Sequence, residues 1–222
     1  MAARKPKGIA ASELRAADGR APGQRGRATR EKLLRCTAAL LEKTSYRDLS
    51  VIEIARRAGT SPATFYQYFP DIEAAVLVLA QQMAEDARKL TVLIDEADWR
   101  GKGAARAAEA LADGFLDLWE RHRAVLRVVD LSTAEGDLRF ANIRSHLLNE
   151  VTLRLRDVIE SFKLAGRHPA SLEPMAHAAA LVSMLAHIAA HRYGFEFWGI
   201  KTDDVRASAA ALLVTGVTGR RT

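Results

Sequence analysis

The stretch that decides the fold is SVIEIARRAGTSPATFYQYF, residues 50–69. Ser50 is followed three residues later by a glutamate, which matches a capping box at the start of a helix. Gly59 suits the left-handed residue that ends a helix. Ser61 and Pro62 suit the cap and the first turn of a second, short helix. The stretch therefore predicts two helices joined by a tight glycine turn, which is the arrangement of a helix-turn-helix.

The second helix of this pair presents polar groups without charge. Phe65 and Phe69 are four residues apart, so we expect them to share the buried side. The remaining side chains carry hydroxyl and amide groups that can bond base edges or phosphates. We expect the exposed rim to comprise Ala63, Thr64, Tyr66, Gln67 and Tyr68. A plain structural corner has the same outline, and Tyr66 packing against its neighbours is the alternative to a reading role.

All of the net charge of +6 lies in the first 30 residues, which hold eight basic and two acidic side chains. The segment is rich in Gly, Ala and Pro, and we expect a flexible basic arm over residues 1–28. A cationic arm attracts polyanions, and nucleic acid fits because each neutralised phosphate releases condensed counterions. A solubilising tail without a target is the alternative.

The rest of the chain predicts an all-α protein. Ala, Leu, Glu and Arg dominate, and alternating strand patterns are scarce. The composition, 49% hydrophobic and 27% charged, excludes wholesale disorder, and no apolar run approaches a membrane span. With one cysteine and no secretory signal, a cytoplasmic location is the simplest interpretation. We expect helices near 29–44, 50–58, 62–69, 71–96, 104–121, 123–131, 137–165, 172–198 and 203–216.

Residues 46–79, YRDLSVIEIARRAGTSPATFYQYFPDIEAAVLVL, resemble the DNA-binding domain of TetR/AcrR-type transcriptional regulators. The resemblance implies a homodimer on a pseudo-palindromic double-stranded DNA operator. It implies a helix-turn-helix head over residues 29–70 and a helical ligand-binding and dimerisation body over 71–222. The expected function is that of a repressor released by a small apolar effector, without a cofactor. An activator and a low-specificity architectural DNA-binding protein are the alternatives.

Carried over residue by residue, the resemblance gives phosphate contacts to Ser50 and Tyr68 and reading roles to Thr64 and Tyr66. Three further positions of the second helix fall where the family varies, so we expect them to set operator choice: Pro62, Ala63 and Gln67. The complete expected DNA-binding set is Arg25, Arg27, Thr29, Arg30, Ser50, Thr60, Ser61, Pro62, Ala63, Thr64, Tyr66, Gln67 and Tyr68.

The sequence departs from the family pattern at two positions. Ile72 stands where a phosphate-binding lysine is usual, and Ser45 stands where glycine is usual. We expect the basic residues Arg25, Arg27 and Arg30 to replace the missing contact, in the minor groove.

In the body, His187 and His191 are four residues apart on one helical face, a spacing that suits a metal. No third ligand is evident, and Ile188 stands where a zincin has glutamate. We therefore expect no metal here. We expect the two histidines to be polar groups that line a cavity or a dimer face. The expected ligand-binding set is Phe115, Trp119, Phe140, Met184, His187, His191 and Trp198, with plain core as the alternative.

Two helices of the body are candidates for dimer packing. They are the Ala-rich helix over 172–192 and the last helix of the chain, because small side chains allow two helices to approach closely. A helix buried within one subunit would look similar.

Enzyme activity has no positive support in the sequence. There is no nucleophile elbow, no phosphate-binding P-loop and no dinucleotide fingerprint. An enzymatic body fused to a DNA-binding head would need a polar catalytic cluster, which cannot be assembled from these residues.

Overall fold

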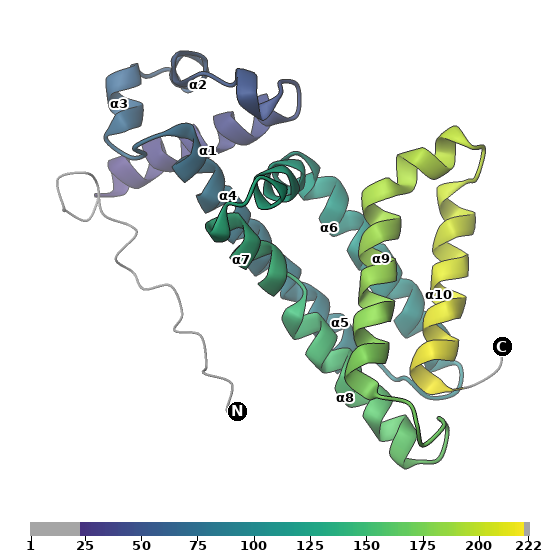
Figure 1. The fold of residues 1–222 in the computed structure, drawn as a ribbon. Coiled ribbons are helices and arrows are strands. Elements are labelled where there is room, and N and C mark those ends of the chain that lie inside the picture. Colours follow the sequence, from purple (N-terminus) through teal and green to yellow (C-terminus); the bar gives the residue numbers. More distant parts are fainter. Residues whose placement is uncertain (1–22, 220–222) are drawn as a thin grey trace. The chain divides into compact units, whose positions relative to one another are not determined.

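The computed structural model describes residues 23–219, and all regular secondary structure in this part of the chain is helical (Figure 1). The all-α prediction is therefore confirmed. Contacts divide the chain into one unit that ends at Leu79 and a second that begins at Ala80. The helices are α1 (Gln24–Leu41), η2 (Tyr46–Asp48), α2 (Val51–Arg57), α3 (Pro62–Tyr66), α4 (Ile72–Ala87), α5 (Lys89–Asp95), α6 (Gly103–Ala134), α7 (Leu138–His146), α8 (Asn149–Leu164), α9 (Pro174–Phe197) and α10 (Thr202–Thr218).

The helix-turn-helix predicted over residues 50–69 is present in the first unit. The Ser50 hydroxyl accepts a hydrogen bond from the Glu53 N–H (3.2 Å), so it caps α2 as expected. Gly59 has φ +65° and follows the last turn of α2. The next N–H, of Thr60, donates to the Ala55 carbonyl (2.9 Å), which completes a Schellman turn and ends the helix.

The core of the first unit includes the inner side of α3. Phe65 and Phe69 are 0% and 2% exposed, and their ring centroids are 5.5 Å apart. Apolar side chains of α1 and α2 belong to the same core, among which Leu33 and Ile54 are fully buried. Burying each of these side chains contributes roughly 1.5–3 kcal/mol, so the inward aromatic pair holds the short α3 in place.

The first helix begins at Gln24 and not at Thr29, so the predicted boundary between arm and helix is wrong. Residues 1–22 of the predicted basic arm lie outside the described residues. The Arg27 N–H donates to the Gly23 carbonyl (3.0 Å), and the Thr29 hydroxyl donates to the Arg25 carbonyl (3.0 Å). A glycine at position 26 costs a helix about 1 kcal/mol, but the neighbouring arginines and glutamine are good helix formers and the helix continues through it.

The second unit is a bundle arranged around α6, which packs mainly against α7, α9 and α10. Figure 1 shows α9 and α10 running side by side, and α8 packs against α9. Phe115, Leu155 and Leu213 are almost fully buried at the centre. Gly219 ends α10 with φ +67°, where a Cβ would meet the Arg167 carbonyl oxygen, so only glycine fits.

Three predicted helix boundaries in the body are wrong. Residues 104–131 lie in one helix, because nothing between Arg121 and Arg123 interrupts it. Residues 137–165 form two helices, because the consecutive Leu147 and Leu148 both turn into the core and break the helical period. The predicted helix 71–96 is divided near Arg88, whose carbonyl accepts hydrogen bonds from both the N–H and the hydroxyl of Thr91.

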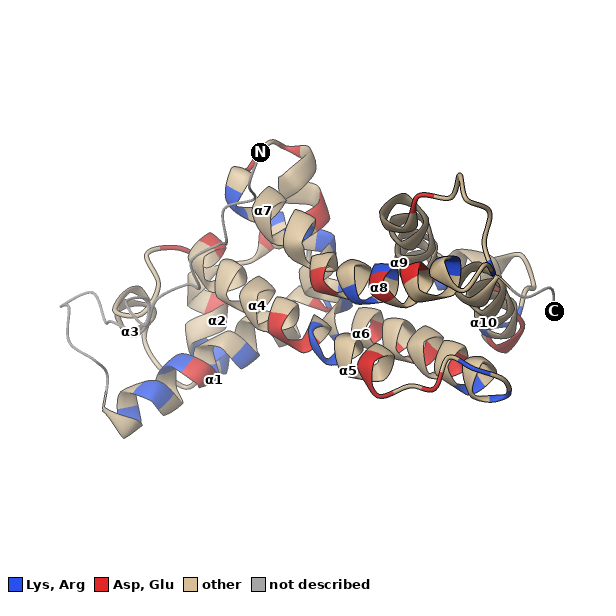
Figure 2. Ribbon diagram, turned by 90° about the horizontal axis from the view of Figure 1, so that it is seen from below, with Lys and Arg blue, Asp and Glu red and all other residues tan. Residues whose placement is uncertain are grey.

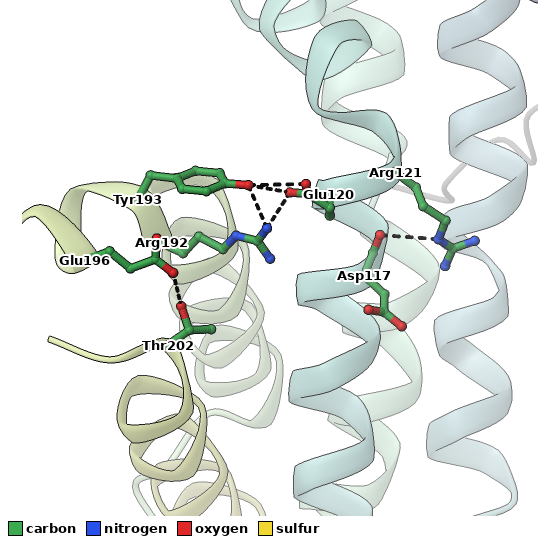
Figure 3. A network of polar contacts seen from close by, with 7 residues as sticks. All are labelled: Asp117, Glu120, Arg121, Arg192, Tyr193, Glu196 and Thr202. Atoms are coloured by element: carbon green, nitrogen blue, oxygen red, sulfur yellow. Dashed lines mark hydrogen bonds and ion pairs between the residues drawn. The ribbon is translucent and has the colours of Figure 1, made fainter. Parts of the chain in front are cut away.

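A polar network joins α6 to α9 at the surface of the second unit (Figure 3). Glu120 of α6 accepts hydrogen bonds from Arg192 and from the Tyr193 hydroxyl. The Arg123 guanidinium lies over the Tyr193 ring, 4.4 Å from its centroid. The Arg192 guanidinium also donates a hydrogen bond to the Tyr193 hydroxyl (2.8 Å), which is the largest cause of the raised pKa of Arg192, and the charge of Glu120 adds to it.

Within residues 23–219, no helix is both long and apolar enough to cross a bilayer.

Candidate nucleic-acid interface and body cavity

The outer side of α3 is accessible to a partner. Tyr66 is 53% exposed, although its ring meets the buried Phe65 edge to face at 5.8 Å. Gln67 is exposed and Tyr68 is half-buried. The buried phenylalanines therefore fix the backbone, while the Tyr66 ring and the Gln67 amide remain available to a partner.

The N-terminal end of α3 is organised by its own hydroxyl groups. The Ser61 hydroxyl accepts a hydrogen bond from the Thr64 N–H (3.2 Å), and the two side-chain hydroxyls lie 3.0 Å apart. Pro62 and Ala63 are exposed beside them. Small exposed side chains at a helix N-terminus permit close approach of a phosphate or a base edge.

The segment from Ala58 to Pro70 contains no charged residue. Figure 2 shows the contrast, since α3 is free of blue and red whereas α1 carries several basic side chains. Arg56 and Arg57 stand at the end of α2 and are exposed. Among the described residues of this unit, the basic side chains therefore lie outside α3, chiefly on α1 and at the end of α2.

Two α1 cations lie close to the helix-turn-helix. The Arg30 guanidinium lies over the Phe69 ring, 5.2 Å from its centroid. The Lys32 ammonium lies 3.6 Å from the position that a Cβ on Gly59 would occupy, which places it at the turn. Sequence reasoning missed Lys32, because only the folded pairing of α1 with the turn brings it there.

The remaining residues predicted to bind DNA lie on α1 and in the turn. Arg25 and Arg27 are exposed on α1, and Thr29 is half-buried with its hydroxyl bonded within the helix. The Thr60 hydroxyl is bonded to the Ser61 carbonyl in the turn. The structure therefore brings the α1 arginines into the same unit as α3, whereas four of the predicted hydroxyls are already bonded to the backbone, those of Thr29, Ser50, Thr60 and Ser61.

Asp71, which stands next to the unusual Ile72, has a structural role at the start of α4. Asp71 caps α4, because its carboxylate accepts the Ala74 N–H at 2.7 Å. A negative charge at a helix N-terminus is also favoured by the helix dipole. Helix capping accounts for Asp71, while no cation occupies the position at which the family pattern has lysine.

The second unit contains a cavity of about 500 Å³, a size typical of small-molecule sites. It opens to the surface, since its lining residues His187 and His191 are exposed. Helices α6 to α9 supply the lining, which combines an apolar part with a polar part. The lining residues are Trp119, Asp130, Arg144, Ser145, Leu148, Asn149, Thr152, Ala179, Val182, Ser183, Ala186, His187, Ala190 and His191.

The structure brings together three of the seven residues predicted for ligand binding. These are Trp119, His187 and His191, which all line the cavity. Within the described residues, the two histidines belong to no group of three or more metal-binding side chains.

The other four predicted ligand-binding residues lie outside this lining. Phe115 stacks on Trp119 with the centroids 6.0 Å apart, but it is itself part of the core, as is the fully buried Phe140. Met184 is half-buried on α9, and Trp198 is 80% exposed at the end of that helix. For Phe115 and Phe140, the alternative of plain core therefore describes the structure better.

The lining is more polar than the predicted apolar effector requires. Sequence reasoning missed Asp130, Arg144 and Asn149, which come from three different helices. No local pattern marks these residues, because only the packing of α6, α7 and α8 makes them neighbours.

A second polar contact links the end of α4 to α6. The His122 Nε2–H donates to Asp86 Oδ2 at 3.0 Å, and Lys89 donates to the other oxygen at 2.6 Å. Burial lowers the pKa of His122, and this outweighs the opposing effect of Asp86. The pKa of Asp86 is also lowered, chiefly by the hydrogen bond from Lys89.

Comparison with known proteins agrees with this architecture. The family model described as "Bacterial regulatory proteins, tetR family" matches residues 33–78, and the model described as "Tetracyclin repressor-like, C-terminal domain" matches residues 90–222. The transcriptional regulator EthR of Mycobacterium tuberculosis is 29% identical over 166 residues, which cover 73% of this chain and 75% of EthR.

Solved structures show the same fold at low sequence identity. The fatty acid degradation regulator FadR from Bacillus halodurans has a TM-score of 0.65 at 15% identity, and the match covers 90% of this chain and 100% of FadR. FadR from Bacillus subtilis, solved in complex with stearoyl-CoA, has a TM-score of 0.63 at 15% identity, with coverages of 84% and 98%. The chain belongs to the tetR family of bacterial regulatory proteins and is a DNA-binding transcriptional regulator.

Proposed function

We propose that this protein is a homodimeric repressor that binds a pseudo-palindromic operator and is released by a small effector. Residues 24–70, which include the whole of α1, form the DNA-binding part, and residues 71–222 form the effector-binding and dimerisation part. The observation that carries the proposal is the exposed, uncharged outer side of α3, held by buried Phe65 and Phe69. Each α3 enters the major groove, and two copies read half-sites about one helical turn apart.

In this proposal, reading and anchoring are divided between different helices. Tyr66 and Gln67 contact bases, because they are exposed and carry hydrogen-bonding groups of the α3 region. The cations of α1, Lys32 included, contact phosphates on either side. These cations replace the contact that a lysine at Ile72 would make.

The second unit supplies the partner contact and the effector site. Its last helix, α10, exposes small side chains and Leu212, which is 55% exposed. Such a face suits close packing against a second copy. The cavity of about 500 Å³ supports an effector-binding role, and so does the complex of the similarly folded FadR from Bacillus subtilis with stearoyl-CoA.

The test is selection of operator sequences from random double-stranded DNA with the full-length protein, followed by footprinting. We expect a footprint with inverted symmetry and half-site centres roughly 34–36 Å apart. A footprint without inverted symmetry contradicts the proposal.

Removing residues 1–22, which leaves α1 intact, separates reading from simple charge attraction. We expect sequence-specific binding to survive with a shallower dependence on salt, by about 0.9 in the log–log slope for each lost phosphate contact. Complete loss of specific binding would favour a low-specificity architectural protein in which the arm supplies the affinity.

A further inference from the structure

The cavity in the second unit contains the two histidines whose ring nitrogens have no hydrogen-bond partner within the described residues. All six histidines of the chain lie in residues 23–219. His187 and His191 contact each other, with ring centroids 4.3 Å apart, and both line the cavity. The other four each have a ring nitrogen in a hydrogen bond: His122, His146, His168 and His177.

An arginine faces the same cavity with part of its guanidinium unused. Arg144 donates from Nε to Asp130 Oδ1 at 2.8 Å, and no other hydrogen bond of this side chain occurs within residues 23–219. Asp130 thus orients the guanidinium and leaves its terminal nitrogens available for a planar acceptor. Arg139 on the same helix differs, because Asp137 engages it through two hydrogen bonds, at 3.2 and 2.7 Å.

The hydrogen-bond donors of the lining favour an anion over a cation. Among the lining residues of the described chain, Asp130 and Arg144 alone are formally charged, and they already pair with each other. A cation would find one carboxylate, which is already paired with Arg144, and the two imidazoles lack a third metal-binding partner among the described residues. An oxyanion would find a guanidinium, two imidazoles and the Asn149 amide as donors.

The lining also has an apolar part, which includes an aromatic ring. Trp119 is 6% exposed and is stacked on Phe115, which fixes its ring. Leu148, Val182 and Ala186 continue the apolar wall. An indole ring and aliphatic side chains suit the apolar part of an amphipathic molecule.

We propose that this cavity binds an amphipathic organic oxyanion, a carboxylate or a phosphate ester. Its acidic group lies on Arg144, His187 and His191, and its apolar part lies against Trp119. The proposal rests on the effector-binding role proposed above and replaces the expected apolar effector with an anionic one. It is tested without DNA, so its outcome is independent of the operator proposal.

The test is isothermal titration calorimetry of the full-length protein with three probes that share a naphthalene ring: 2-naphthoate, 2-naphthyl phosphate and the uncharged 2-naphthamide. We expect at least one anion to bind roughly tenfold or more tightly than the amide, because charge-assisted hydrogen bonds are lost in the amide. The R144Q variant, which removes the positive charge, and the double variant H187A/H191A, which removes both imidazole donors, should each remove this preference. R139Q, on the same helix outside the lining, should retain it.

Stronger binding of 2-naphthoate than of 2-naphthyl phosphate identifies the ligand class as a carboxylate. The reverse order identifies it as a phosphate ester. Equal binding of all three probes overturns the proposal. A dissociation constant above about 1 mM for both anions also overturns it. An equal loss in R139Q and R144Q also overturns it, because the effect would then come from net charge and not from the cavity. Circular dichroism of each variant verifies that it is folded.

Discussion

At the residue scale, the two sides of α3 have different roles: the inner side packs in the core, and the outer side is expected to read DNA. Phe65 and Phe69 turn inward and are almost fully buried, whereas Tyr66 and Gln67 are exposed. A four-residue aromatic spacing suffices to predict this division, because only one side of so short a helix can face the core. Substitutions on the outer side should therefore change DNA binding without changing the fold.

We expect Tyr66→Ala and Gln67→Ala each to weaken operator binding by about 1–3 kcal/mol, because each removes a group available to base edges. Fluorescence anisotropy with the selected operator measures this loss, and thermal unfolding should be nearly unchanged. Gln82→Ala, at an exposed glutamine of α4, is the matched control and should leave affinity intact. Unchanged affinity in both α3 variants would remove this helix from the reading role.

A second residue-scale prediction concerns His122. Its pKa in the folded chain is below the usual value of about 6.5, because burial disfavours the charged ring. As the pH falls through about 6.5, the unfolded chain takes up a proton that the folded chain does not, and stability decreases. Asp86 does not contribute here, because its lowered pKa keeps it ionised until the pH falls below the usual aspartate range.

The change in melting temperature between pH 7.5 and pH 5.5 measures this effect. His122→Gln keeps an N–H donor for Asp86 but cannot titrate, so we expect a smaller drop than in the wild type. His146→Gln is the control, since that exposed ring bonds the Asn142 carbonyl one turn away on its own helix, and it should behave like the wild type. An unchanged drop in His122→Gln contradicts the prediction.

At the scale of elements, helix ends marked by a side chain were predictable and helix junctions inside the body were not. Ser50, Gly59 and Ser61 act through neighbours within a few residues, so both partners of each contact stand close together in the sequence. The break at Leu147 depends on which direction leads into the core, and that is decided by other helices. The same reason hid the pairing of the cavity residues Asp130 and Arg144, which lie on different helices.

The turn between α2 and α3 gives a prediction about backbone conformation. Gly59→Ala should destabilise the first unit by about 1–2 kcal/mol, because φ +65° is unfavourable for alanine even where space is available. Gly194→Ala is the contrasting variant, since this glycine lies within α9 with no atom within 4 Å of an added Cβ. It should stabilise, by about 0.5–1 kcal/mol, and urea denaturation distinguishes the two signs.

At the scale of the whole molecule, the proposed repressor needs two copies, and α10 offers a face for that contact. We expect Leu212→Glu to convert the dimer to monomer, because it places a charge in an apolar interface. Sedimentation velocity measures the change. Leu164→Glu is the control, since this residue is 83% exposed at the end of α8, and the variant should stay dimeric. A dimeric Leu212→Glu variant would place the contact elsewhere.

The length of α6 has a mechanical consequence. At 1.5 Å per residue, its 32 residues form a rod of about 48 Å, and Trp119 lies near the middle. Its first turns are anchored by buried alanines such as Ala104 and Ala108. If α6 pivots about these first turns, a displacement of about 1 Å at Trp119 corresponds to about 2 Å at Ala134. A small displacement of the indole ring is therefore doubled at the C-terminal end of the helix.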